Sequence, residues 1–252
     1  MKVTVSTASN SVSIADSGIL ASDAMLTRTY DPRLLVRQFG DFHNNVGDFV
    51  EVLASSGIVQ YNITSDLPSK NGVAILTPLN GTSGSSAAIR SSPVTPSIVL
   101  GSEEMRISSK LYLALSNVGD VAFIRSGFGF FISQSPGTQD AAYFRCGTFT
   151  GLTTSTNWYC TTIRDGVATN FDTGLPVATP RVLSVEVNAA ATSVVFRNNG
   201  SVVYTSTTNI PTATSVSGGS MYAGSFLSHN SASAGANRMG IDYMLFDQYV
   251  QR

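Results

Sequence analysis

The chain has 252 residues, a formal net charge of −1, 42% hydrophobic residues and only 12% charged residues. This length suits one large β domain, and this apolar content is enough for a packed core, which excludes wholesale disorder. The near-neutral charge excludes a basic surface for nucleic acid, and no apolar run reaches the ~18 residues of a membrane span.

The N-terminal 40 residues differ from the rest of the chain. Val3 and Val5 alternate with polar residues, which predicts short extended pieces. The segment holds too few large apolar residues to build a core of its own, and it lacks the continuous apolar run of a signal peptide. We therefore predict an extended attachment arm over residues 1–40, a folded domain over residues 41–252, and synthesis in a cytosol.

Strand signals begin after the arm. The apolar runs Phe49–Leu53 and Ile58–Ile63 flank Ser55-Ser56-Gly57, and this spacing predicts a β-hairpin. Val73–Leu76 predicts a further short strand. The Gly- and Ser-rich stretch over residues 80–86 predicts a loop.

The remainder of the chain is the most regular part. Two dipeptides, Asp165-Gly166 and Asn199-Gly200, lie between apolar runs and predict two-residue hairpin turns. The predicted strands are Met105–Leu115, Val121–Ser133, Ala141–Cys146, Trp158–Arg164, Val182–Val187, Val194–Arg197, Val202–Tyr204, Met221–Leu227 and Met239–Val250. About twelve strands without a repeat period predict an all-β fold, a two-sheet antiparallel jelly-roll sandwich.

The residue types that bind metals are sparse. Cys146 and Cys160 are too few for a disulfide scaffold or a cysteine-built zinc site, and we expect both to be buried thiols. His43 and His229 lie far apart and form no ligand-spaced pair. The sequence therefore predicts no metal site and no cofactor.

Glycoside hydrolysis is the enzymatic reaction that β-sandwiches often host, and it needs two carboxylates about 5–9.5 Å apart. Two acids at positions i and i+2 of a strand share one face. Glu103 and Glu104 are adjacent instead, and Asp242 and Asp247 are five positions apart. No Gly-x-Ser-x-Gly nucleophile motif accompanies a usable His and acid. We predict a non-enzymatic protein without catalytic residues.

One tripeptide, Asn157-Trp158-Tyr159, is a candidate glycan-binding site. It places the sole tryptophan of the chain next to an amide and a phenol, and sugar sites combine an aromatic ring with planar polar groups. Two interpretations stay open: Trp158 stacks on a sugar, or Trp158 fills the core where the two sheets meet.

Several segments together carry a resemblance to a known family. They are Asn157–Gly166, Asp172-Thr173-Gly174, Arg181–Asn188, Val194–Gly200, Thr208–Pro211 and Ile241–Gln248. This series resembles the lectin-like, concanavalin-type sandwich of many tailed-bacteriophage virion proteins. The resemblance covers about residues 100–250 well and about residues 45–100 loosely, and it has no counterpart for the arm.

The resemblance implies a structural protein on the surface of a phage particle, as a capsid decoration, head fibre or tail fibre. The implied partners are other virion proteins and further copies of the chain, which virion symmetry would arrange as a trimer. The implied location is the virion, assembled in the host cytoplasm. The alternative is a glycan-binding module that recognises a host-surface sugar through Asn157, Trp158 and Tyr159.

Overall fold

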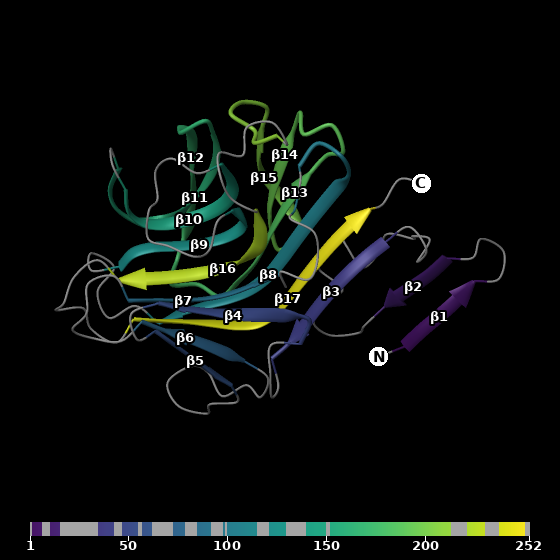
Figure 1. The fold of residues 1–252 in the computed structure, drawn as a ribbon, viewed down its shortest axis with the longest axis horizontal. Helices are drawn as coiled ribbons and strands as arrows, with labels where there is room; N and C mark the ends of the chain where they lie inside the picture. The colour runs from purple at the N-terminus through teal and green to yellow at the C-terminus, as the bar shows by residue number, and fades with distance from the viewer. Residues whose placement is uncertain are drawn as a thin grey trace.

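The computed structural model describes residues 2–6, 11–15, 35–42, 47–54, 57–61, 73–78, 85–91, 98, 100–114, 121–129, 140–149, 152–212, 221–229 and 237–249. The strands over these ranges run from β1 to β17 in chain order (Figure 1). Within the same ranges, the chain forms no helix with the length and apolarity needed to span a bilayer.

Two antiparallel sheets form the body of the molecule. The seven-stranded sheet has the order β12, β11, β10, β9, β16, β7, β4, with bounds Val167–Pro176, Leu152–Arg164, Ala141–Phe149, Val121–Gly129, Tyr222–His229, Ser86–Ser91 and Phe49–Ala54. The eight-stranded sheet has the order β15, β14, β13, β8, β17, β6, β5, with bounds Ser201–Ser206, Val194–Asn198, Arg181–Val187, Glu104–Ala114, Arg238–Tyr249, Ala74–Thr77 and Ile58–Tyr61. Its remaining strand is β3, which spans Leu35–Asp41 and pairs with β17. The predicted two-sheet antiparallel jelly-roll sandwich is confirmed.

The core lies between the two sheets and is built around aromatic rings. Phe144 of β10 contacts Phe196 of β14 edge to face, with ring centroids 5.3 Å apart, and so joins the two sheets. Phe128 of β9 and Phe246 of β17 make a second such contact at 6.2 Å. Edge-to-face packing is the arrangement that the aromatic quadrupole favours. These contacts fix which face of each sheet is turned inward.

The two hairpin predictions from turn residues are confirmed. Asp165 and Gly166 join β11 to β12, and Asn199 and Gly200 join β14 to β15. All four residues have positive φ, between 49° and 81°, as a type I′ turn requires. Asn199 also binds the neighbouring strand, because its Oδ1 accepts a hydrogen bond of 3.0 Å from the backbone N–H of Val182.

The predicted hairpin between Phe49–Leu53 and Ile58–Ile63 is wrong. The first run is β4, which pairs with β7 in the seven-stranded sheet. The second is β5, which pairs with β6 in the eight-stranded sheet. The chain therefore crosses from one sheet to the other at this point. Gly57 permits the crossing, because a Cβ there would lie 1.9 Å from the carbonyl oxygen of Ser86 in β7.

Strand β7 is one of the elements that the sequence pattern does not predict. It consists of Ser-Ala-Ala-Ile-Arg-Ser, and every residue of it is buried. Its serines and alanines give no strong apolar alternation, which would predict a strand. The Gly- and Ser-rich pattern over residues 80–86, which ends at its first residue, favours a loop. Residues 80–84 of that predicted loop lie outside the described ranges.

The N-terminal segment contains two different structures. Strands β1 (Lys2–Ser6) and β2 (Ser11–Ala15) pair with each other as a separate two-stranded sheet, which stands beyond β3 in Figure 1. Strand β3 belongs to the sandwich and crosses residue 40, the predicted end of the arm. The extent of the arm stays a prediction.

Candidate functional site

The face of the seven-stranded sheet turned away from the core is called here the outer face. Side chains alternate along a strand, so the residues between the core positions lie on it. Strand pairing aligns them into two rows across all seven strands. The first row comprises Val50, Arg90, Gly224, Gly127, Tyr143, Thr161 and Asn170. The second row comprises Val52, Ala88, Phe226, Arg125, Arg145, Tyr159 and Asp172.

Three arginines stand on this face, which is unusual for a chain with so few charges. Arg90 is 9% exposed, Arg125 3% and Arg145 4%. Arg125 and Arg145 are direct partners in the register of β9 and β10. Burial lowers the pKa of both groups, and the charge of Arg125 lowers the pKa of Arg145 further. The outer face therefore concentrates positive charge where solvent screens it little.

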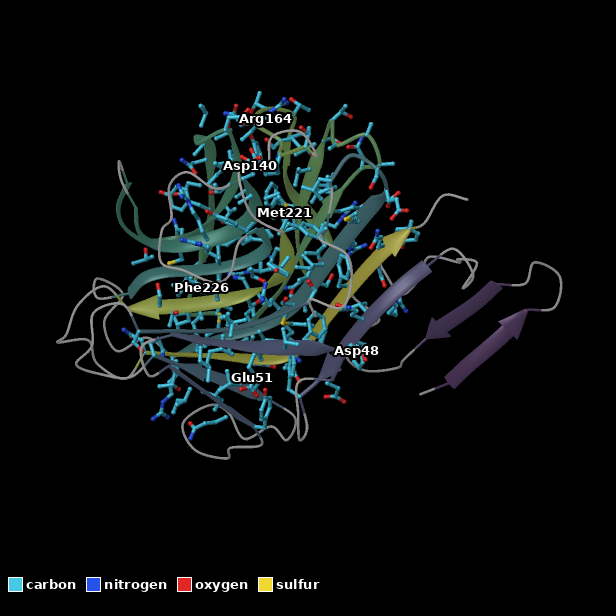
Figure 2. All side chains as sticks on the ribbon, in the orientation of Figure 1. Asp48, Glu51, Asp140, Arg164, Met221 and Phe226 are labelled. Carbon is cyan, nitrogen blue, oxygen red and sulfur yellow. The ribbon has the colours of Figure 1, made fainter. Side chains whose placement is uncertain are left out.

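The arginines are surrounded by aromatic rings and by an amide. The guanidinium carbon of Arg90 lies 3.5 Å from the centre of the Tyr222 ring. That of Arg125 lies 5.6 Å from the ring of Tyr143 and 5.2 Å from the ring of Phe226, which Figure 2 labels on β16. These distances suit cation–π attraction.

Arg90 keeps donors that the described residues do not use. Its Nε and Nη1 atoms are buried and have no hydrogen-bond partner. Its strand neighbour on β16 is Gly224, which is followed across the sheet by Gly127. The outer face therefore bears no side chain at the two positions that follow Arg90 in the first row.

The glycines are required by the close approach of neighbouring backbones. A Cβ on Gly127 would lie 2.6 Å from the carbonyl oxygen of Ala142, and its φ of 149° is one that other residues rarely adopt. A Cβ on Gly224 would lie 2.6 Å from the carbonyl oxygen of Ile89.

Access to solvent differs along the face. Its middle is closed, since Phe226, Arg125 and Tyr143 are almost completely buried. The end at β4 is more open, because Val50 and Tyr222 are half-buried. The end at β12 is the most open: Tyr159 is half-buried, and the polar residues of β12 beside it are exposed. A ligand therefore has two places to reach this face.

The open end at β12 combines a phenol ring with amide and carboxylate groups. Asn170 Oδ1 accepts hydrogen bonds from Arg145 Nη2 at 2.6 Å and from Thr161 Oγ1 at 2.9 Å. These bonds orient the amide so that its Nδ2 group is left as a donor. Asp172 is the register partner of Tyr159 and accepts a hydrogen bond of 3.2 Å from Asn157 Nδ2.

A β-bulge positions Asp172 at the open end of the face. The predicted Asp172-Thr173-Gly174 turn lies inside β12, where the register with β11 shifts between Asn157 and Tyr159. The backbone N–H of Gly174 donates to Asp172 Oδ1 at 2.8 Å, and Thr173 Oγ1 donates to the carbonyl oxygen of Trp158 at 2.6 Å. Bulges re-aim side chains next to binding sites, and this one brings Asn157 and Asp172 together.

The three residues of the predicted glycan site are divided between two faces. Asn157 and Tyr159 lie by the outer face, but Trp158 is 1% exposed and its ring meets Phe144 edge to face at 6.4 Å. Trp158 therefore fills the core and offers no surface for stacking on a sugar. The physical reason is strand alternation, which sends neighbouring side chains to opposite faces.

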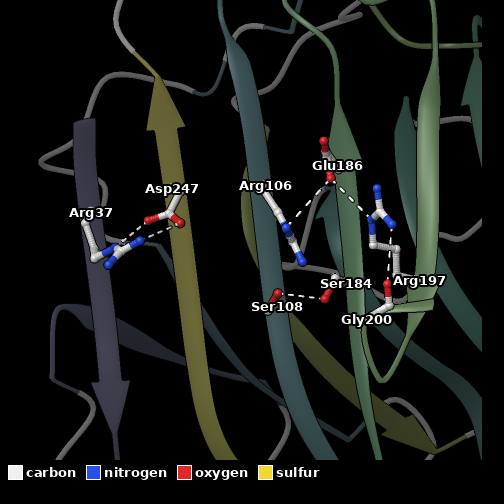
Figure 3. A network of polar contacts seen from close by, with 8 residues as sticks. All are labelled: Arg37, Arg106, Ser108, Ser184, Glu186, Arg197, Gly200 and Asp247. Carbon is white, nitrogen blue, oxygen red and sulfur yellow. Dashed lines mark hydrogen bonds and ion pairs between the residues drawn. The ribbon is translucent and has the colours of Figure 1, made fainter. Parts of the chain in front are cut away.

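The outer face of the eight-stranded sheet carries a charge ladder, defined as Arg37, Asp247, Arg106, Glu186 and Arg197 (Figure 3). Arg37 donates to both carboxylate oxygens of Asp247, at 2.6 and 2.9 Å. Glu186 lies 3.8 Å from Arg106 and 3.4 Å from Arg197. Positive and negative groups alternate across five strands, so each arginine of the ladder has a carboxylate on a neighbouring strand, and the ladder joins the strands.

The residues suited to metals or nucleophilic chemistry are not gathered into a site. Cys146 and Cys160 are buried thiols that form no disulfide; burial raises the pKa of Cys146 to about 12 and also raises that of Cys160. The described residues contain no group of three or more His, Cys, Asp or Glu side chains that could hold a metal ion. His43 lies outside the described ranges.

The outer face also lacks a carboxylate pair in its described part. In the two rows defined above, Asp172 is the single acidic residue. The other positions that a substrate would meet carry arginine, tyrosine or small residues. Hydrolysis by the two-carboxylate mechanism would need a second acid about 5–9.5 Å away.

Sequence reasoning identifies Asn157 and Tyr159 but misses the three arginines, Asn170 and Asp172 as members of one surface. A signal does exist for the arginines, because each is the sole charged residue inside its strand, as in Ala141–Cys146. Their convergence depends on strand pairing, which a single sequence does not show.

No protein-family model matches the chain, and no curated protein matches it. Solved structures do. A protein of unknown function from Shewanella oneidensis MR-1 is 13% identical, with a TM-score of 0.61, over 86% of this chain and 89% of that one. The carbohydrate recognition domain of Emp47p is 11% identical, with a TM-score of 0.54, over 88% of this chain and 100% of that one. An endo-1,3-beta-glucanase from Streptomyces sioyaensis is 12% identical, with a TM-score of 0.52, over 87% and 98%.

These similarities define the class of fold: a lectin-like, concanavalin-type jelly roll. The predicted lectin-like architecture is confirmed. At identities of 11–13% the likeness concerns the fold alone. Because the same fold occurs in a recognition domain and in a glucanase, it does not decide between binding and catalysis.

Proposed function

We propose that this chain is a carbohydrate-binding protein that holds a sugar at the open end of the outer face, on β10, β11 and β12. One observation carries this proposal: the half-buried ring of Tyr159 lies beside Asn170 and Asp172, whose polar groups point to the same face. A sugar ring offers an apolar face and several hydroxyl groups, which match an aromatic ring flanked by donors and acceptors.

Each polar group at this end has bonding capacity left for a ligand. Asn170 uses its oxygen within the chain and keeps its NH₂ group as a donor. The Asp172 Oδ2 atom receives a single long contact, at 3.5 Å from Asn157. The contacts inside the cluster also fix the side-chain rotamers, so little conformational entropy is lost when a sugar binds.

We propose binding without hydrolysis. The single acid of the two rows, Asp172, has no second carboxylate across from it to serve as general acid or nucleophile. An assay of glycan release by the purified protein tests this point, and turnover above that of an Asp172→Asn variant would contradict it.

Two adjacent substitutions on opposite faces test the site. Tyr159→Ala is expected to weaken glycan binding strongly on an array and to change the free energy of unfolding by less than about 1 kcal/mol. Trp158→Ala is expected to cost about 3–5 kcal/mol of stability, because a buried ring is removed from the core. Phe171→Ala is the matched control, since Phe171 is an exposed ring of β12 that stacks on Tyr204 on the other side of the strand.

The proposal would be contradicted if the wild-type protein bound no glycan, or if Tyr159→Ala bound as wild type does. It would also be contradicted if Phe171→Ala lost binding to the same extent as Tyr159→Ala. Each variant needs a thermal denaturation curve, so that loss of binding is separated from loss of fold.

A second role, as a structural component on the surface of a phage particle, is proposed from the sequence resemblance. None of the structures named above is described as a virion protein. The observation that favours this role is the β1–β2 hairpin, which pairs with neither sheet of the sandwich. A hairpin of this kind is marginally stable alone, so docking on a neighbouring virion protein would complete it.

Cosedimentation with particles that lack this protein tests the second role. The truncation should remove residues 1–34 and keep β3, because Leu35–Asp41 pairs with β17 in the sandwich. The full chain is expected to sediment with the particles and the truncated chain to remain in solution. Equal sedimentation of the two would contradict the attachment role, and light scattering would show whether the chain forms the proposed trimer.

A further inference from the structure

We propose that Arg90 and Tyr222 form a second binding subsite, at the β4 end of the outer face, which takes the carboxylate of an acidic sugar. The subsite lies on β7 and β16, and Arg90 on β7 is four strand spacings from Tyr159 on β11, or about 19 Å along the sheet at ~4.8 Å per strand. It is therefore distinct from the site of Tyr159, Asn170 and Asp172. The inference rests on the proposed function and adds to it the chemical class of the sugar.

The first argument is the state of the Arg90 donors. Nε and Nη1 are buried, and the described residues offer them no hydrogen-bond partner. Buried polar groups in native proteins are nearly always satisfied, and a charged donor without an acceptor costs free energy. An oxygen of a bound ligand would supply the acceptor for these two donors.

The second argument is that Arg90 is held in place by a contact that leaves those donors unused. Its guanidinium carbon lies over the Tyr222 ring, 3.5 Å from the centroid, and this contact restrains the side chain without using its N–H groups. The unused N–H groups on Nε and Nη1 point in different directions, so each can donate to a separate ligand oxygen, and a carboxylate oxygen is the acceptor that a charged donor binds most strongly.

The third argument is access. Val50 of the edge strand β4 is the register partner of Arg90 and is half-buried, as is Tyr222. On the other side of Arg90, Gly224 carries no side chain that could occupy the space beside the guanidinium. The ring of Tyr222 supplies an apolar surface next to the charge, as a sugar ring that bears a carboxylate requires.

A matched pair of polymers tests the carboxylate directly: polygalacturonate, and the same polymer with its carboxylates chemically reduced to alcohols. The wild-type protein is expected to bind the acidic form about 10-fold to 100-fold more tightly than the reduced form in calorimetry, because a charge-assisted bond is lost on reduction. Arg90→Met should bind the two forms alike. Arg90→Lys, which keeps the charge but not the planar set of N–H donors, should retain a small part of the preference.

Three controls separate the Arg90 subsite from a general effect of positive charge, from the Tyr159 site, and from binding of any carboxylate. Arg164→Met removes the same charge from the exposed β11–β12 turn and should keep the full preference. Tyr159→Ala should weaken binding of both polymers while the acidic form remains the tighter ligand. Polyglutamate offers carboxylates without sugar rings and should bind at least tenfold more weakly than polygalacturonate.

The outcomes distinguish the two proposals. Equal affinity of the wild-type protein for both polymers, or an acid preference that survives in folded Arg90→Met, overturns the Arg90 subsite and leaves the Tyr159 site standing. Polyglutamate binding as tight as polygalacturonate, and lost in Arg90→Met, overturns the sugar as the source of the carboxylate. Reduced polymer that binds Tyr159→Ala as tightly as wild type overturns the proposed function instead.

Discussion

The two outer faces of this sandwich both bury arginines, and they treat them in opposite ways. On the eight-stranded sheet, Arg37, Arg106 and Arg197 face carboxylates on adjacent strands. On the seven-stranded sheet, Arg90 and Arg125 lie against aromatic rings and Arg145 donates to an amide. In the first arrangement each arginine has a carboxylate partner, whereas in the second the described residues offer Arg90 Nε and Nη1 no hydrogen-bond acceptor.

The difference teaches how to separate structural from ligand-binding arginines. A guanidinium paired with a carboxylate is part of the fold, and its removal leaves a partner charge buried. A guanidinium restrained by a ring alone keeps its hydrogen-bonding capacity for another molecule. The partners of an arginine, rather than its burial, therefore indicate its role. Four substitutions, two on each sheet, test what stabilises the two faces, from the largest expected effect to the smallest.

The largest effect is expected for Asp247→Ala. Asp247 is 0% exposed and binds Arg37 through both oxygens, so the change leaves the half-buried charge of Arg37 without its partner. The free energy of unfolding in urea should fall by about 3 kcal/mol. Arg164→Ala, which breaks an exposed ion pair of 3.5 Å, should change it by less than about 1 kcal/mol. Equal losses in the two variants would show that the ladder does not stabilise the sheet.

A smaller loss is expected for Gly127→Ala on the seven-stranded sheet. The new methyl group would meet backbone atoms of β10 at 2.6 Å, and the residue would have to keep a φ of 149°. We expect a loss of about 1–3 kcal/mol in chemical denaturation. Gly174→Ala is the control, because Gly174 also has positive φ but no atom within 4 Å of the added carbon. If both variants lost the same amount, strand approach would not be what requires glycine at position 127.

Arg90→Met should change stability by less than about 1 kcal/mol, in contrast to Asp247→Ala. The lost attraction to the Tyr222 ring is offset because two unsatisfied buried donors are removed with it. Denaturation midpoints of the two variants, measured side by side, give the comparison. A loss as large as that of Asp247→Ala would make Arg90 a structural residue and break the distinction between the faces.

The smallest effect is a pH dependence on the eight-stranded sheet. Lys110 contacts Asp242 at 2.6 Å. Burial alone lowers the pKa of Lys110, but the hydrogen bonds and charges of Asp242 and Tyr112 outweigh it and raise the pKa above its ordinary value of 10.5. The folded state thus favours the charged form. Its contribution is complete below pH 10.5 and is lost as the pH rises through the folded pKa.

Lys110→Met should therefore lose less stability than the wild-type protein between pH 10 and 12, as followed by thermal denaturation across that range. Other groups titrate in the same range, and the difference between the two proteins cancels their contributions. Parallel curves for the two proteins would show that Asp242 does not bind Lys110 in solution.

Much of the fold could be predicted from the sequence, because local chemistry dictates it. Asp165-Gly166 and Asn199-Gly200 specify hairpins through their tolerance of positive φ, and both hairpins are present. Pairing between distant strands is not local. The runs around Gly57 therefore suggest a hairpin, although the structure sends them to different sheets. Strand β7 is missed because serine and alanine carry no apolar period.

The candidate site could be predicted only in part, for the same reason. The tripeptide at Asn157 locates the correct strand, but its strongest cue, Trp158, lies on the core face. Arg90 is the sole charged residue between Lys70 and Glu103, yet an isolated arginine in a sequence does not reveal its neighbours. Its relation to Tyr222 arises from the pairing of β7 with β16, more than 130 positions apart.

The place of β17 has a consequence for the order of events during synthesis. This strand lies between β8 on one side and β6 and β3 on the other, and its contact with Arg37 joins positions 210 residues apart. A ribosome must therefore release nearly all of the sandwich before its central strand exists. Until then β3, β6 and β8 expose unpaired edges, which favours association between nascent chains. We expect slow folding with strong concentration dependence of the yield, as is typical of topologies dominated by distant contacts.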